Sequence, residues 1–127
     1  MPEKHIFEYA VFRVVPRVER EEFINVGIIL YCAKQKFLKA VMCVNEARIM
    51  AFAADIEIDF VKENLDAIIK ICKGGGDAGP IGQLDDASRF RWLTATRSTV
   101  VQASKVHPGF CKNAEETLQK LVQQLVV

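Results

Sequence analysis

The segment "RFRWLTATRSTVVQ", residues 89–102, combines three arginines with four hydroxyl side chains. Arg97 lies at an expected strand junction, and Thr94 and Ser98 are close to it in the sequence. A guanidinium presents a planar fork of donors, and neighbouring hydroxyls can donate to the same anion, so this group suits a carboxylate or a phosphate. The favoured interpretation is structural: an ion pair between Arg97 and Glu19, Glu21 or Glu22 of the turn "RVEREE", residues 17–22.

His107, in the segment "KVHPGF", is a second candidate for chemistry. Pro108 and Gly109 follow it and predict a loop, because the residue before a proline is biased away from helical angles. Histidine exchanges a proton readily near neutral pH, so His107 could act as an acid or a base. A catalytic triad also needs a matched nucleophile and an orienting group, which spacing alone does not supply. A polar loop residue is therefore the favoured interpretation.

A third polar group lies in "VFRVVPRVEREEFINVGIILY", residues 11–31, where Arg17, Glu22 and Asn25 flank the start of an expected strand. Asparagine tolerates unusual backbone angles, and Gly27 lets another backbone approach closely, so the favoured interpretation is a β-bulge. The alternative is a pocket in which Glu22 and Asn25 face Arg97.

Composition limits the classes of partner. The chain has 127 residues, 26% charged and half hydrophobic, with a formal net charge of +1, which predicts one globular domain over residues 1–127. The nearly neutral net charge argues against nucleic-acid binding. A local exception is the stretch between residues 87 and 114, which contains five lysines and arginines and no acid. We find no signal peptide and no apolar run long enough to span a membrane, and predict a soluble cytoplasmic protein. Four isolated cysteines predict buried thiols, not a metal site.

Hydrophobic patterning predicts an α+β domain of about five mostly antiparallel strands packed against two or three helices. The expected strands are residues 6–15, 23–32, 37–44, 90–95 and 98–104. The expected helices are 46–52, capped by Asn45, about 59–73, and one that begins after Asn113. Residues 74–83 are glycine-rich and predict a flexible loop, since they lack the Gly-Lys-Ser/Thr of a phosphate loop.

Several of these motifs together resemble a known family. The marks are the segments "TATRST" and "VHPG" and a pattern formed by Arg13, Pro16, Glu22, Phe23, Asn25, Val26 and Gly27. From about Phe7 to Leu125 the chain resembles the family called domain of unknown function 3037, found mainly in bacteria. The resemblance implies a compact intracellular domain without an established activity. It also implies a loose association with kinases similar to HipA, and hence a protein partner.

We therefore expect a non-enzymatic accessory or binding module that acts through a partner protein. The alternative is an enzyme of phosphoryl or acyl chemistry, or a binder of anions or nucleotides, with a pocket around Arg97. No catalytic residue, metal ligand or cofactor is assigned. The predicted ligand-binding residues are Arg97, Ser98, Thr94, Arg17, Glu22, Asn25 and His107.

Overall fold

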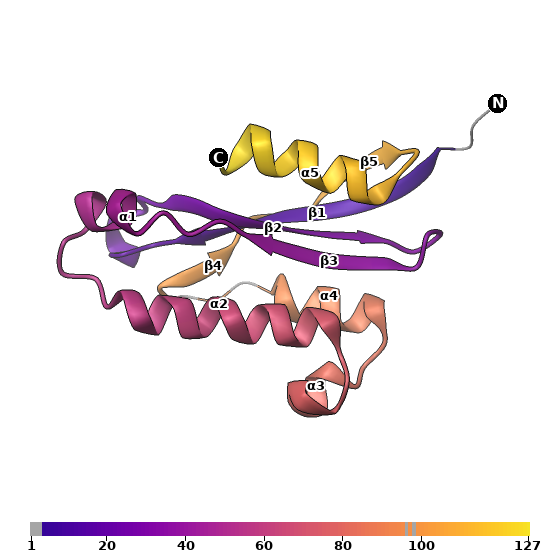
Figure 1. The fold of residues 1–127 in the computed structure, drawn as a ribbon, viewed down its shortest axis with the longest axis horizontal. Helices are drawn as coiled ribbons and strands as arrows, with labels where there is room; N and C mark the ends of the chain where they lie inside the picture. The colour runs from indigo at the N-terminus through magenta and orange to yellow at the C-terminus, as the bar shows by residue number, and fades with distance from the viewer. Residues whose placement is uncertain (1–3, 96, 98) are drawn as a thin grey trace.

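The computed structural model describes residues 4–95, 97 and 99–127. Its centre is a five-stranded antiparallel sheet in the order β3-β2-β1-β4, with β5 also paired to β1 (Figure 1). Strands β4 and β5 share one edge of β1, because β4 pairs with residues 12–14 and β5 with residues 5–9. The strands are β1 (His5–Val14), β2 (Ile24–Cys32), β3 (Phe37–Met42), β4 (Val101–Ala103) and β5 (His107–Cys111).

Helices cover both faces of the sheet, with α5 on one side and α2 and α4 on the other (Figure 1). The helices are α1 (Glu46–Phe52), α2 (Ile58–Lys73), α3 (Gly79–Gly82), α4 (Asp86–Leu93) and α5 (Ala114–Leu125), with 3₁₀ turns η1 (Val18–Arg20) and η2 (Gly76–Ala78). The observed class is α+β, which confirms the predicted class and the expected number of strands.

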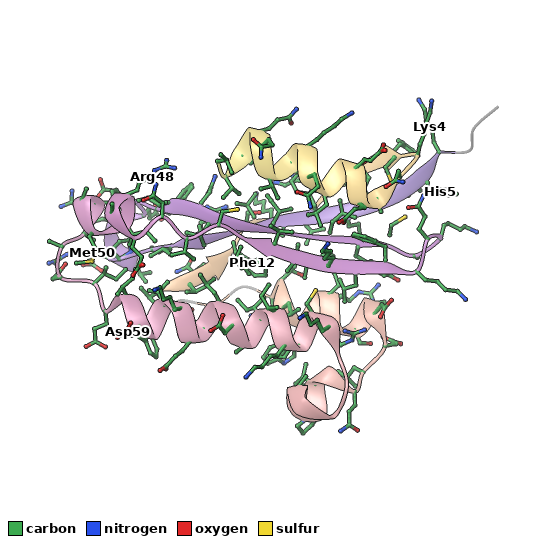
Figure 2. All side chains as sticks on the ribbon, viewed as in Figure 1. Lys4, His5, Phe12, Arg48, Met50 and Asp59 are labelled. Carbon is green, nitrogen blue, oxygen red and sulfur yellow. The ribbon has the colours of Figure 1, made fainter. Side chains whose placement is uncertain are left out.

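The alternation of β1 divides the core into two layers. Ala10 and Phe12 belong to the cluster that packs against α2, and Figure 2 shows Phe12 between the sheet and that helix. Phe7 and Val11 belong to the cluster that packs against α5. The weak alternation of β1 in the sequence predicted a strand covered on both faces, and this is confirmed.

Two of the predicted caps are present. The side chain of Asn45 accepts from the Arg48 amide at the start of α1, and that of Asn113 accepts from the Glu116 amide at the start of α5. Each bond satisfies one amide that the first helical turn leaves without a partner. Helix α2 ends at Lys73, and Gly74 follows with a positive φ of 77°, as the sequence predicted.

The bulge predicted at the start of the second strand is also present. Phe12 pairs with Gly27, but Arg13 pairs with Asn25, so Val26 is the extra residue of β2. A Cβ on Gly27 would lie 2.2 Å from the sulfur of Met42, a residue of β3. Glycine is therefore required here for the close approach of the two strands.

The strand predicted over residues 90–95 is wrong, because these residues lie mostly in α4. Asp85 caps the helix by accepting from the Ser88 amide at 2.8 Å. Phe90 and Leu93, three residues apart, are buried on one helical face, whereas Trp92 is exposed. The alternation of Phe90 and Trp92 suggested a strand, but only one of these two rings faces the core.

The loop predicted around His107 is likewise wrong, since residues 107–111 form β5. Gly109 lies opposite Phe7, and a Cβ on this glycine would come within 2.6 Å of the Phe7 ring. Pairing with β1 outweighs the local preference of a His-Pro-Gly sequence for a turn.

Residues 74–83 lie between α2 and α4 and contain η2 and α3, and the Gly75 amide donates to the Gly82 carbonyl at 3.1 Å. The flexibility of this segment stays a prediction.

Candidate functional site

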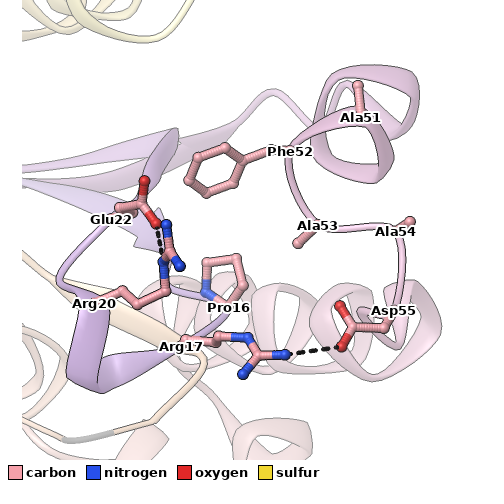
Figure 3. Close-up of a pocket in the computed structure, with 9 residues that line it drawn as sticks. All are labelled: Pro16, Arg17, Arg20, Glu22, Ala51, Phe52, Ala53, Ala54 and Asp55. Carbon is pink, nitrogen blue, oxygen red and sulfur yellow. Dashed lines mark hydrogen bonds and ion pairs between the residues drawn. The ribbon is translucent and has the colours of Figure 1, made fainter.

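The connection between β1 and β2 and the chain after α1 enclose a cleft of about 450 Å³, which we call the Arg17 cleft (Figure 3). Pro16, at the end of β1, and Phe52, at the end of α1, supply apolar surface. The volume is in the range of small-molecule sites. The lining residues are Pro16, Arg17, Arg20, Glu22, Ala51, Phe52, Ala53, Ala54 and Asp55.

Charges in the Arg17 cleft are balanced in pairs. Arg20 donates through Nε to Glu22, and this hydrogen bond raises the pKa of the Arg20 guanidinium. Arg17 lies 3.8 Å from Asp55, and both side chains are mostly exposed. The cleft thus brings together two of the predicted residues, Arg17 and Glu22. Among the described residues, the lining contains no histidine, cysteine, serine or lysine, and both of its carboxylates lie beside an arginine.

A second depression, which we call the Arg13 basin, lies at the sheet edge where the chain passes from β4 to β5. Its volume is about 660 Å³, and it brings together two other predicted residues, Thr94 and His107. Arg13 and Lys105 also line it, although the sequence analysis did not select them as ligand residues. The lining is Arg13, Thr94, Ala103, Ser104, Lys105, Val106 and His107, with no acidic residue.

Arg13 lies near the end of β1, and its guanidinium carbon lies 4.0 Å from the centre of the Phe23 ring. Its Nε is buried and has no hydrogen-bond partner among the described residues. Arg13 also lines a neighbouring depression that contains Glu21, Phe23 and Gln102. A charged residue inside a central strand was the sequence signal that could have identified Arg13.

Arg97 lies at the end of α4, separate from both depressions. Its guanidinium is 4.5 Å from the centre of the Trp92 ring and donates to the Trp92 carbonyl at 2.6 Å. A cation at this place satisfies carbonyl groups that the last helical turn leaves without partners. Within the described chain no ion pair joins Arg97 to an acid of residues 17–22, where Glu22 pairs with Arg20. Ser98 lies outside the described residues.

Asn25 is separated from the other predicted residues. Its Nδ2 donates to the Leu125 carbonyl at 3.0 Å, which ties β2 to the end of α5. It also lines a smaller pocket of about 260 Å³ together with Arg48 and Val126. The structure therefore does not bring Glu22, Asn25 and Arg97 into a common pocket, because each contacts a different neighbour.

The sequence analysis gave no role to Arg89, which the structure places in the interior. Arg89 is only 8% exposed. It donates to the carbonyls of Ile71, Cys72 and Leu84 and pairs with Asp86. It thereby joins α4 to the end of α2, a structural task.

Two of the cysteines, Cys72 and Cys111, offer little reactive thiolate. Burial raises the pKa of Cys72 to about 12, and burial together with the neighbouring Cys32 raises that of Cys111. Cys32, Cys72 and Cys111 are buried as predicted, and Cys43 is half-buried.

Among the described residues no three histidine, cysteine or acidic side chains are grouped to hold a metal ion. Within the same part of the chain, no helix combines the length and the apolarity that a membrane crossing requires.

The structure is that of an α+β domain with the Arg17 cleft and the Arg13 basin on its surface. A family profile described as "Protein of unknown function (DUF3037)" matches residues 9–126. The chain therefore belongs to this family. Comparison with curated proteins and comparison with solved structures each gave no match.

Proposed function

We propose that the protein is a non-enzymatic binding module that acts through a partner protein. The observation that carries this proposal is an exposed apolar pair at the sheet edge. Ile6 and Phe110 lie directly opposite each other in the β1–β5 ladder and are 60% and 70% exposed. Opposed residues of a ladder point to the same face, so the two side chains form adjoining apolar surface. Exposed aromatic and aliphatic side chains of this kind are typical of protein interfaces.

The backbone beside this pair is also suited to a partner. β5 pairs with β1 on one side, and in the part of the chain that the structure describes no strand pairs with its other side. An open strand edge presents amide and carbonyl groups to which an extended segment can add as a further strand. Pro108 contributes no amide, so the edge supports a short pairing.

Charge around Phe110 indicates the composition of the partner segment. Lys4, Lys112 and Lys120 line the surface beside Phe110, with a single acid, Glu116. Complementary charge favours encounter and selects among partners. The partner that fits is an extended segment with an apolar residue between acidic ones. A kinase similar to HipA, in the cytoplasm of a bacterium, is the first protein to examine for such a segment.

Co-expression with a candidate kinase tests the proposal, followed by co-purification and measurement of the dissociation constant. Phe110→Ser should weaken the complex at least about tenfold, as expected for an exposed aromatic anchor of an interface. The matched control is Phe60→Ser, a change at a 52% exposed phenylalanine on α2. Equal binding by Phe110→Ser and the wild type contradicts the proposed surface. If no tested candidate binds the wild type at micromolar concentrations, those partners are excluded.

The alternative function, an enzyme of phosphoryl or acyl chemistry that uses Arg97 and His107, has less support. Arg97 donates to carbonyls at the end of α4, and the ring of His107 packs 5.3 Å from that of Tyr9. Among the described residues, no hydrogen bond joins either side chain to a serine, threonine or cysteine. A binding function uses the same residues without requiring a nucleophile.

A further inference from the structure

We infer that the Arg13 basin is a binding site for a phosphate group, either free phosphate or a small phosphomonoester. This site goes beyond the proposed function and lies apart from Ile6 and Phe110. Arg13, Lys105 and His107 line the basin, and among the described residues no acid lines it. The chain as a whole is almost neutral, with a net charge of +1, so the pairing of two cations, Arg13 and Lys105, is local. A dianion suits such a site better than a neutral or zwitterionic ligand.

The state of Arg13 is the strongest argument. Its Nε is buried and has no hydrogen-bond partner among the described residues, so the protein leaves this guanidinium incompletely paired. Packing against Phe23 restricts the guanidinium on one face, so the fork is oriented before a ligand arrives. An oriented guanidinium can bind two phosphate oxygens at once.

The Arg17 cleft provides an internal comparison. Both of its arginines have a carboxylate nearby, Arg20 with Glu22 and Arg17 with Asp55. A phosphate entering that cleft would compete with these acids and be repelled by them. The ion pairs found in the described residues do not include Arg13 or Lys105. An added anion should therefore bind more favourably in the basin than in the Arg17 cleft.

Hydroxyl groups at the rim fit the same ligand. Thr94 closes α4 and lines the basin, and its Oγ1 donates to the Phe90 carbonyl at 2.8 Å. Ser104 accepts from the Val11 amide at 2.9 Å, so this hydroxyl holds the chain between β4 and β5 in place. Thr94 can accept a hydrogen bond from a protonated phosphate or a bridging water, whereas Lys105 supplies the mobile charge.

The volume of the basin limits the ligand. At about 660 Å³ it is in the range that holds small molecules, and two or three cations neutralise one phosphate group. A nucleic-acid strand needs a longer run of cations along the surface. A phosphomonoester with a small organic group therefore fits, with the phosphate on Arg13 and Lys105.

The test is a titration of the ¹⁵N-labelled protein at constant ionic strength with inorganic phosphate, glycerol phosphate and, for comparison, acetate. We expect saturable shifts of the amide signals of residues 104–107 with either phosphate compound, and weaker or linear shifts with acetate. Stronger binding of glycerol phosphate would identify an ester as the ligand, and equal binding would favour free phosphate. No saturation below about 10 mM phosphate, or saturable shifts confined to another surface, would overturn the site.

Three substitutions separate the basin from other sites. Arg13→Gln should abolish saturable phosphate binding, and Lys105→Gln should weaken it at least about fivefold, in line with the loss of one charge-assisted contact. Lys105 is exposed, so this variant keeps the test valid if Arg13→Gln does not fold. Arg17→Gln is the matched control and should bind phosphate like the wild type. Unchanged binding by Lys105→Gln, or lost binding by Arg17→Gln, would contradict the assignment. Phe110→Ser should keep phosphate binding, which separates this test from that of the partner surface.

Discussion

Arg89 is buried and Arg13 is partly buried, and their environments differ. Arg89 has three carbonyl acceptors and the carboxylate of Asp86. Arg13 has the face of Phe23 and a buried Nε without a partner among the described residues. The difference separates an arginine that completes the fold from one that is available to a ligand. Burial alone does not distinguish the two tasks, whereas the count of satisfied donors does.

The largest effect is expected from removing Arg89. Arg89→Met leaves the carbonyls of Ile71, Cys72 and Leu84 without this donor, and we expect the free energy of unfolding to fall by about 3 kcal/mol. Urea denaturation followed by circular dichroism measures the loss. The control is Arg91→Met, at an exposed position of the same helix, with an expected change below about 0.5 kcal/mol. Similar losses in both variants would show that Arg89 does not hold α4 to α2.

Cys72 reports on the same junction. Its raised pKa of about 12 means that the thiol stays protonated in the folded protein, so labelling by a maleimide at pH 8 should be slow. In Arg89→Met the end of α2 opens more often, and we expect Cys72 to be labelled about tenfold faster. Mass spectrometry of peptides measures the rate, with half-buried Cys43 as internal reference. An unchanged ratio of the two rates would mean that the junction opens independently of Arg89.

Arg13 should be much less important for stability. Arg13→Met keeps apolar contact with Phe23 and removes a buried donor that has no partner among the described residues, so the free energy of unfolding should change by less than about 1 kcal/mol. The same urea experiment measures it beside Arg89→Met. A loss as large as that of Arg89→Met would remove the distinction between the two arginines and weaken the argument for a ligand.

The smallest effect concerns the cap of α4. Hydrogen bonds from Ser88 lower the pKa of Asp85, so its contribution to stability is present at neutral pH and is lost as pH falls through the folded-state pKa. Asp85→Asn keeps a capping oxygen but removes the charge. We expect the stability difference between wild type and Asp85→Asn to shrink from pH 7 to pH 3 in thermal unfolding experiments. A constant difference would show that the charge of Asp85 contributes nothing to the cap.

Local patterns predicted those parts of the fold whose signals lie within one segment. The caps at Asn45 and Asn113 and the end of α2 at Lys73 and Gly74 each follow from neighbouring residues. Residues 89–102, with their three arginines, did not obey this rule. Helix α4 is only eight residues long, so the helical spacing of Phe90 and Leu93 is no longer than the strand-like alternation of Phe90 and Trp92, and the sequence did not separate the two.

The candidate sites show the same limit. The sequence selected Thr94 and His107 as polar residues without an evident structural task, and the structure places both at one basin. It did not join Arg13 to them, because the basin forms only where β4 and β5 meet the same edge of β1. Likewise Arg97 was expected to meet an acid or an anion, but it contacts the Trp92 carbonyl and the Trp92 ring of the preceding helix α4.

By itself, the sequence determined the α+β class, the bulge after Asn25 and the two asparagine caps, because these depend on residue types and spacings that act over one or two turns or along one strand. Tertiary structure decided that residues 107–111 pair with β1, that Arg89 is buried, and that the Nε of Arg13 has no partner among the described residues. Each of these outcomes depends on partners far away in the chain, such as Phe7 for Gly109 and Ile71 for Arg89. Local conformational propensities change the free energy by less than about 1 kcal/mol per residue. Packing and the burial of a charged group change it by several kcal/mol, so the distant contacts decide the structure.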